Sequence, residues 1–142
     1  MESKITGTLH HVELYVSDLE KSKEFWGWFL GLLGYKKFQE WDEGISYRLG
    51  ETYLCFVQTT DKHLGRGYHR CATGLNHLAF HGASREQVDW LRGLVKEKGL
   101  SELYEEKYPY ASGPGYYALY FEDPDRIKVE VVAPEDDGKG SK

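Results

Sequence analysis

Three side chains with metal-binding chemistry, His11, His77 and Glu130, occupy matched points of this sequence. Each histidine lies at the centre of a short run of β-forming residues, and the glutamate lies in another such run near the C-terminal end. Two imidazoles and one carboxylate on one side of a divalent ion leave coordination positions open for a substrate. The residue types therefore predict a catalytic metal site, provided that the fold brings the three side chains to one point.

The runs that carry the histidines begin two similar halves of the chain. Leu9–Val16 and Leu75–His81 each precede a segment with the apolar spacing of an amphipathic helix. These segments end at Gly34 and Gly99, so that the step from histidine to glycine is 23 positions in the first half and 22 in the second. Because similar elements recur at a similar step, the sequence predicts a duplicated unit.

Serine residues mark the expected starts of the two helices. Ser17 is followed three residues later by Glu20, and Ser84 by Gln87. Both pairs match the capping box, in which two side chains satisfy unpaired backbone N–H groups at a helix start. We therefore expect one helix after each histidine-bearing strand.

Three extended segments follow each expected helix, separated by turns rich in glycine, aspartate and proline. The expected strands are Lys36–Trp41, Ile45–Leu49, Thr52–Val57, Ser101–Glu106, Tyr116–Phe121 and Ile127–Ala133. The order β-α-β-β-β, present twice, predicts an α+β fold with mixed sheets. We expect one domain over residues 1–134, made of modules 8–58 and 74–133, and a disordered tail at 135–142.

Side-chain alternation predicts which strand faces carry the polar residues. Because successive residues of a strand point to opposite faces, His11, His77, Glu130 and Tyr120 are expected on the faces that the helices leave uncovered. Most polar residues on such a face are simply solvated. The equivalent placement of the two histidines is what favours a shared metal site.

The composition disfavours several classes of partner. The chain has 142 residues and a net charge of −5, whereas a nucleic-acid-binding protein carries a basic face. No apolar stretch approaches the length of a membrane span, and the N-terminus lacks an export signal. Two cysteines, Cys55 and Cys71, make no disulfide framework. We therefore expect a cytoplasmic protein that binds a small molecule, with neither nucleic acid nor membrane as a partner.

Three longer segments carry a family resemblance: LHHVELYVSDLEKSKEFW, GLNHLAF and YFEDPDRIKVEVVAP. From Leu9 to about Pro134 the chain resembles the vicinal oxygen chelate superfamily of glyoxalases, bleomycin-resistance proteins and extradiol dioxygenases. The resemblance implies a glyoxalase-like fold, in which two βαβββ modules form a cleft around one divalent metal ion. It implies that His11, His77 and Glu130 bind this metal, which is Zn, Ni, Mn or Fe, and that the chain forms a homodimer.

Two positions depart from the patterns of particular subfamilies. Cys55 is the counterpart of Glu130 in the first module, where glyoxalase I usually has a glutamate ligand. Lactoylglutathione chemistry is therefore disfavoured, and a contact between Cys55 and the metal stays open. Glu13 stands where fosfomycin-modifying transferases typically have threonine, which disfavours that activity.

The resemblance implies a metal-dependent enzyme of the lyase or isomerase type, whose substrate chelates the metal through vicinal oxygens. An extradiol ring-cleaving dioxygenase and a non-catalytic antibiotic-binding resistance protein are the alternatives. Proton transfer beside the metal needs an acid or base. The candidates are Glu13, His81 and Tyr120, of which Tyr120 is expected on the strand next to that of Glu130. The Tyr-rich segment Lys107–Tyr117 is expected to form an aromatic lid over the cleft.

Overall fold

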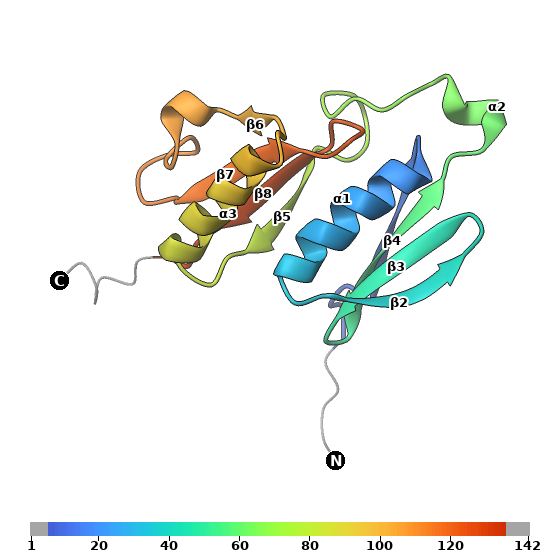
Figure 1. The fold of residues 1–142 in the computed structure, drawn as a ribbon, viewed down its shortest axis with the longest axis horizontal. Helices are drawn as coiled ribbons and strands as arrows, with labels where there is room; N and C mark the ends of the chain where they lie inside the picture. Colours follow the sequence, from blue (N-terminus) through green and yellow to red (C-terminus); the bar gives the residue numbers. More distant parts are fainter. Residues whose placement is uncertain (1–5, 136–142) are drawn as a thin grey trace, which may run out of the picture. The chain divides into compact units, whose positions relative to one another are not determined.

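Each half of the chain folds into a four-stranded sheet with one long helix, as seen in the computed structural model, which describes residues 6–135 (Figure 1). The first half contains β1 (His11–Val16), α1 (Leu19–Leu32), β2 (Lys36–Trp41), β3 (Gly44–Leu49) and β4 (Thr52–Gln58). A short helix, α2 (Asp61–Leu64), follows. The second half contains β5 (His77–His81), α3 (Arg85–Glu97), β6 (Glu102–Leu103), the 3₁₀ helix η1 (Glu105–Lys107), β7 (Ala118–Glu122) and β8 (Lys128–Val132).

The two sheets have the same topology. The strand order is β1-β4-β3-β2 in one and β5-β8-β7-β6 in the other. In each sheet the first and last strands of the repeat pair in parallel, and the other neighbours are antiparallel. This arrangement confirms the predicted α+β fold of two βαβββ repeats with mixed sheets.

The chain divides after Gly67 into two compact units, termed unit 1 and unit 2 below. Each unit contains one sheet and its long helix. The grouping of both into one domain, with modules 8–58 and 74–133, stays a prediction.

The core of unit 1 lies between α1 and one face of its sheet (Figure 1). Trp26 of α1 and Phe56 of β4 are fully buried, and their rings stack with centroids 4.8 Å apart. Burial of a large apolar side chain contributes about 1.5–3 kcal/mol to the free energy of folding. On β1, Leu14 and Val16 are buried whereas His11 is exposed, so that the histidine lies on the face opposite α1, as the alternation predicts.

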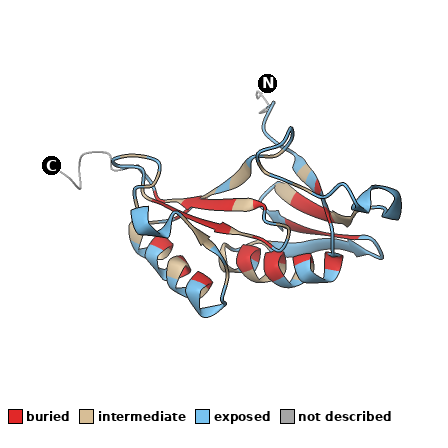
Figure 2. Cartoon of the chain, turned by 90° about the horizontal axis from the view of Figure 1, so that it is seen from above, coloured by how far each residue is buried: buried red, intermediate tan, exposed pale blue. Residues whose placement is uncertain are grey.

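The core of unit 2 follows the same plan. Val88, Leu91 and Val95 form the buried face of α3 at helical spacing. On β8, Val129 and Val131 are fully buried. Figure 2 shows the buried residues on one side of each long helix and along the strands. The residues that alternate with these valines therefore point to the other face of the sheet, which α3 does not cover.

The predicted cap is correct for α3 and wrong for α1. Ser84 Oγ accepts a hydrogen bond from the backbone N–H of Gln87 at 3.0 Å, which confirms the cap of α3. The cap of α1 is Asp18 instead of Ser17. The reason is that Gln58 Nε2 donates a hydrogen bond to the Ser17 carbonyl oxygen at 2.9 Å, which holds this residue in the preceding loop.

Both long helices end at the glycines that the sequence indicates. Gly34 has φ +99° and Gly99 has φ +72°, within the left-handed region that strains any residue with a Cβ atom. In each case the residue before the glycine is the C-cap. The predicted end is therefore confirmed for both helices.

The strand predicted over Ser101–Glu106 is wrong for most of its length. The strand β6 contains only Glu102 and Leu103, and the chain then turns at Tyr104, which has φ +57°. A residue in the left-handed region cannot continue a strand, and the 3₁₀ helix η1 follows directly. The chain between β6 and β7 is therefore a long irregular connection, and part of it lines the pocket described below.

Within residues 6–135, no helix has both the length and the apolar character that a membrane span requires. Of the tail predicted at 135–142, only Glu135 falls within the described residues. The prediction of disorder for the remainder thus lies outside the described part of the chain.

Candidate functional site

The register of the second sheet brings three of the predicted residues together. In this sheet β8 lies between β5 and β7, and Glu130 of β8 pairs with Ala79 of β5 and with Tyr120 of β7. His77 pairs with Lys128, two residues before the glutamate. Because residues at positions i and i+2 share a strand face, Lys128 and Glu130 lie on the side that α3 leaves uncovered.

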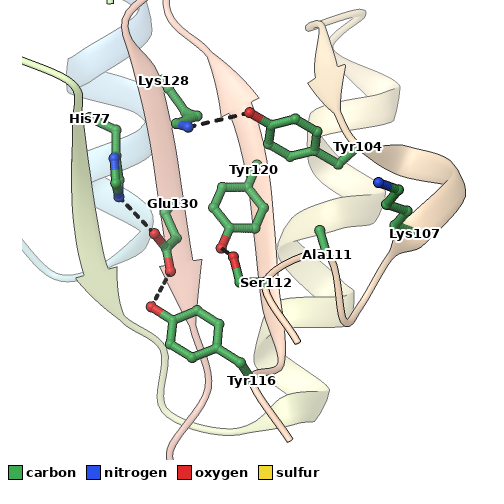
Figure 3. Close-up of a pocket in the computed structure, with 9 residues that line it drawn as sticks. All are labelled: His77, Tyr104, Lys107, Ala111, Ser112, Tyr116, Tyr120, Lys128 and Glu130. Carbon is green, nitrogen blue, oxygen red and sulfur yellow. Dashed lines mark hydrogen bonds and ion pairs between the residues drawn. The ribbon is translucent and has the colours of Figure 1, made fainter. Parts of the chain in front are cut away.

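His77 and Glu130 are in direct contact (Figure 3). The distance between His77 Nε2 and Glu130 Oε1 is 3.0 Å. On the other side of the ring, His77 Nδ1 donates to the side-chain oxygen of Asn76 at 2.6 Å. An imidazole that donates through Nδ1 keeps its lone pair on Nε2 in the neutral form, so that two electron-rich atoms face each other. The pair therefore suits a shared cation, either a proton or a metal ion.

The Glu130 carboxylate is buried, with a residue exposure of 2%. A buried charge needs strong partners, and Tyr116 provides one by donating a hydrogen bond to Glu130 Oε2 at 2.5 Å. This hydrogen bond is the main reason that the pKa of Tyr116 rises to about 12, with burial and the negative charge of Glu130 adding to the increase. Tyr116 therefore stays a proton donor to the carboxylate at neutral pH.

Tyr120 lies beside the same carboxylate, as the sequence predicts (Figure 3). Its hydroxyl shares a short hydrogen bond with the hydroxyl of Ser112. Burial raises the pKa of the Tyr120 hydroxyl, and the charge of Glu130 raises it further. The group is therefore a neutral phenol at physiological pH, able to donate to the oxygen atom of a molecule bound against the sheet.

These side chains line a pocket of about 520 Å³ within unit 2. Its lining residues are His77, Tyr104, Lys107, Ala111, Ser112, Tyr116, Tyr120, Lys128 and Glu130. Pockets for small molecules commonly have volumes of about 300–1,000 Å³. The pocket is thus large enough for a small organic substrate, and its wall is mainly aromatic and hydroxylated.

The connection between β6 and β7 forms one wall of this pocket. Asp89 of α3 fastens this connection: its carboxylate oxygen Oδ1 accepts hydrogen bonds from the hydroxyls of Tyr108 at 2.5 Å and Tyr117 at 2.6 Å. The guanidinium groups of Arg92 and Arg85 lie over the rings of Tyr108 and Tyr117, at 4.1 and 4.8 Å from the centroids. The aromatic segment that the sequence singled out as a lid is therefore bound to α3 at two points, and its role as a lid stays a prediction.

The pair His77 and Glu130 fits a divalent metal ion by its spacing and its hydrogen bonds. Two ligand atoms at about 2.1 Å from one ion and at right angles to each other lie about 3.0 Å apart, which is the Nε2–Oε1 distance seen here. Metal-bound histidines usually donate their other ring N–H to an oxygen acceptor. Asn76 supplies this acceptor for His77. The two donor atoms, an imidazole nitrogen and a carboxylate oxygen, therefore fit a divalent metal ion. A complete coordination shell needs further ligands besides this pair.

In unit 1, the side chains at the positions equivalent to His77 and Glu130 have different surroundings or a different residue type. His11 is exposed, its ring stacks on Tyr53 with centroids 4.6 Å apart, and its Nδ1 lies 2.9 Å from Nδ1 of His10. The register pairs Glu13 with Cys55, so that Cys55 is the structural counterpart of Glu130. Burial raises the pKa of the Cys55 thiol to about 11, with the charge of Glu13 adding to the increase, so that the thiol is protonated at neutral pH. This state is unfavourable for a metal ligand.

Several predicted residues are not brought together by either unit taken alone. His11 and Glu13 belong to unit 1, whereas His77 and Glu130 belong to unit 2. Over residues 6–135, no group of three or more His, Cys, Asp or Glu side chains that could hold a metal ion is found. The convergence of His11 with the other two predicted ligands stays a prediction.

His81 is the remaining candidate, and it does not line the pocket. It is exposed at the end of β5. The register makes Ala79, two residues after His77, the counterpart of Glu13, so that unit 2 has no acid at that position. The role of His81 as a base stays a prediction.

Sequence reasoning missed three features of the site. Asn76 precedes the predicted ligand, and an Asn-His pair is too common to signal a metal site by itself. Lys128 has no role in the sequence predictions, although its position two residues before Glu130 on the same strand could have indicated one. Tyr104 comes from the irregular connection, whose start the strand prediction over Ser101–Glu106 obscured.

The fold agrees with the comparison to known families. The chain belongs to the glyoxalase/bleomycin resistance protein/dioxygenase superfamily, since the sequence model of that family matches residues 8–131. This match confirms the resemblance inferred from the three segments of the sequence.

Individual relatives and solved structures resemble this chain to different degrees. The uncharacterized protein YqjT of Bacillus subtilis (strain 168) is 55% identical over 126 residues, which cover 89% of this chain and 98% of YqjT. The crystal structure of a candidate glyoxalase from Bacillus halodurans, at 2.10 Å resolution, is 56% identical with a TM-score of 0.90, and covers 91% of this chain and 97% of that one. A mutant of the fosfomycin resistance protein FosX from Listeria monocytogenes is 21% identical with a TM-score of 0.64, covering 94% and 96% of the two chains. That FosX structure was solved in complex with Mn(II) and 1S,2S-dihydroxypropylphosphonic acid.

Proposed function

We propose that this protein is a divalent-metal-dependent enzyme of the lyase or isomerase type, which acts on a small substrate that chelates the metal through vicinal oxygens. The proposed ligands are His11, His77 and Glu130. The observation that carries the proposal is the pair His77 and Glu130, 3.0 Å apart, with Asn76 holding the outer nitrogen of the imidazole. The presence of Mn(II) in FosX, which shares the fold, supports a metal in this family.

The residues of the chain have distinct tasks in this proposal. When bound, the metal would act as a Lewis acid that stabilises negative charge on the substrate oxygens. Tyr116 orients the Glu130 carboxylate through its 2.5 Å hydrogen bond. The Tyr120 hydroxyl lies in the pocket, where it can donate a hydrogen bond to a substrate oxygen.

Proton movement needs a base, and Glu13 of unit 1 is the proposed one. An isomerisation of an α-hydroxyketone balances if one carboxylate moves the carbon-bound proton to the neighbouring carbon, while the hydroxyl proton moves to the former carbonyl oxygen. We further propose that the enzyme works in the cytoplasm as a homodimer. Sedimentation velocity tests the assembly, because a monomer at micromolar concentration contradicts it.

The test of the metal site is isothermal titration of the purified, chelator-treated protein with Mn²⁺, Zn²⁺, Ni²⁺ and Fe²⁺, the last under anaerobic conditions. We expect one ion per chain for the wild type and loss of binding for His77→Ala. The matched control is His81→Ala, which removes a histidine from the same strand outside the pocket and should bind metal as the wild type does. Equal binding by all three proteins contradicts the proposal.

The reaction type is tested with the metal that binds. Incubation with α-hydroxyketones and α-ketoaldehydes, followed by NMR in D₂O, detects exchange and isomerisation at carbon. A catechol panel with the Fe²⁺ protein and oxygen detects ring cleavage by its yellow products. If the protein cleaves the ring and does not exchange the carbon-bound proton, the dioxygenase assignment takes the place of the isomerase assignment. If it binds the metal and catalyses neither reaction, the result supports a binding protein.

A further inference from the structure

Two ammonium groups line the pocket in addition to the proposed metal ligands. They belong to Lys107 of η1 and Lys128 of β8 (Figure 3). Lys128 is half-buried, and its Nζ donates to the Tyr104 hydroxyl at 3.3 Å. Its Nζ also lies 5.5 Å from the centroid of the Tyr104 ring and 5.9 Å from that of Tyr120. The side chain is therefore held over the pocket by neutral aromatic neighbours.

Neither lysine is neutralised by a carboxylate within the described residues, since neither takes part in an ion pair there. The one carboxylate among the pocket-lining residues is Glu130, and it is already in contact with His77 and Tyr116. With a neutral imidazole, the lining residues carry one net positive charge. A divalent ion bound beside Glu130 would make the pocket strongly cationic. The low dielectric constant of the pocket wall strengthens the attraction of these positive charges for an anion.

We propose that the substrate carries an oxyanion group, a carboxylate, phosphate or phosphonate, which Lys107 and Lys128 bind together with the Tyr104 hydroxyl. This inference rests on the proposed function, because the vicinal oxygens of the same substrate would lie at Glu130. Lys128 is two residues from Glu130 on one strand face, a separation of about 7 Å between the two residues. The oxyanion group is therefore a few bonds away from the chelating oxygens.

The arrangement differs from an ordinary lysine-bearing surface. Exposed lysines are commonly solvated or paired with neighbouring acids, as Lys37 is with Glu40 in unit 1. In the pocket the two ammonium groups come from elements that are far apart in the sequence. The Tyr104 hydroxyl lies beside the Lys128 ammonium group, and a phenol hydroxyl donates to an anion as readily as to a neutral oxygen.

The test compares three chelators that share a hydroxamate and differ in charge. Acetohydroxamate is the neutral probe, and succinohydroxamate and phosphonoacetohydroxamate carry a carboxylate and a phosphonate. We expect the Mn²⁺-loaded wild type to bind the charged probes at least about tenfold more tightly, since a charge-assisted hydrogen bond contributes that much. In Lys107→Gln/Lys128→Gln the preference should fall to near unity, with the affinity for acetohydroxamate unchanged. The relative order of the two charged probes identifies the type of oxyanion.

The matched control is Lys62→Gln/Lys96→Gln, which removes two exposed lysines outside the pocket. This control should keep the wild-type preference, which separates a local site from the net charge of the protein. Lys107→Gln alone, at an exposed position, should reduce the preference about threefold if the double variant does not fold. Equal affinity of the wild type for neutral and charged probes overturns the inference, as does an undiminished preference in the double variant.

Thermal unfolding of the metal-free protein separates this inference from the proposed function. If the wild type binds no metal, the proposed function fails. In that case stabilisation by inorganic phosphate or succinate, lost in Lys107→Gln/Lys128→Gln and kept in the control variant, still supports the oxyanion site. Absence of any stabilisation overturns it.

Discussion

The replacement Asn76→Ala tests how the imidazole of His77 is prepared for a metal. In the wild type Nδ1 donates to the amide oxygen at 2.6 Å, which leaves the lone pair on Nε2. Without this acceptor, the tautomer with its proton on Nε2 becomes favourable, because that N–H can donate to Glu130 Oε1 at 3.0 Å. The proton then occupies the position between the two atoms where a metal would bind.

The expected magnitude follows from the position of Asn76. Loss of a hydrogen-bond partner of a metal-bound histidine lowers the affinity for the metal by about 10–100-fold. Asn76 is exposed, so that water replaces part of its function, and we expect a value near the lower limit, about tenfold. By the usual conversion this is about 1.4 kcal/mol of binding free energy at 25 °C.

The assay is titration with Mn²⁺ at pH 7.5, combined with ¹H–¹⁵N correlation NMR of the histidine rings. We expect Asn76→Ala to bind about tenfold more weakly and to show the shift of the His77 tautomer in the metal-free protein. Asn76→Asp keeps an oxygen acceptor at the same place and should bind metal at least as tightly as the wild type. The reasoning is refuted if Asn76→Ala retains full affinity, or if Asn76→Asp loses as much as Asn76→Ala.

Three further results are expected. Tyr116→Phe removes the hydroxyl that donates to Glu130 at 2.5 Å. Because Tyr116 is partly exposed, the affinity for the metal, measured by titration, should fall only about fivefold. Tyr110→Phe, which lies outside the pocket, should leave the metal affinity unchanged. The hydrogen bond from Tyr108, followed by that from Tyr117, lowers the pKa of Asp89, so its contribution to stability is complete above the ordinary pKa near 3.9 and is lost as the pH falls through the lower value of the folded state. In urea unfolding, the difference between wild type and Asp89→Asn should therefore shrink from pH 6 to pH 3, and a constant difference contradicts this cause. The pKa of Cys55 is raised to about 11, so iodoacetamide at pH 8 should alkylate only the exposed Cys71 in mass spectra, and rapid double labelling of the folded protein contradicts the assignment.

Elements with a local signal were predictable from the sequence. The strand-helix-strand order follows from alternation, helical spacing and the glycines Gly34 and Gly99, each of which depends on residues close in the chain. The placement of Tyr120 beside Glu130 was predictable for the same reason, because a tight turn joins β7 to β8 and fixes their register.

Features that depend on contacts distant in sequence were not predictable. The cap of α1 shifted by one residue because Gln58, 41 positions after Ser17, binds the loop. The connection after Leu103 left the expected strand at Tyr104, a residue type without a strong preference for positive φ. Tyr104 consequently lines the pocket, although the sequence placed it within a strand.

The hydrogen bonds between Asp89 and the two tyrosines have a consequence for how this pocket could evolve. The helix α3 supplies no atom to the pocket surface, yet one of its carboxylates anchors the chain that forms a wall. Substitutions on the solvent side of α3 can therefore remodel ligand selectivity while every residue that touches the ligand stays the same. A search for the origin of new specificities among homologous proteins would need to include this helix.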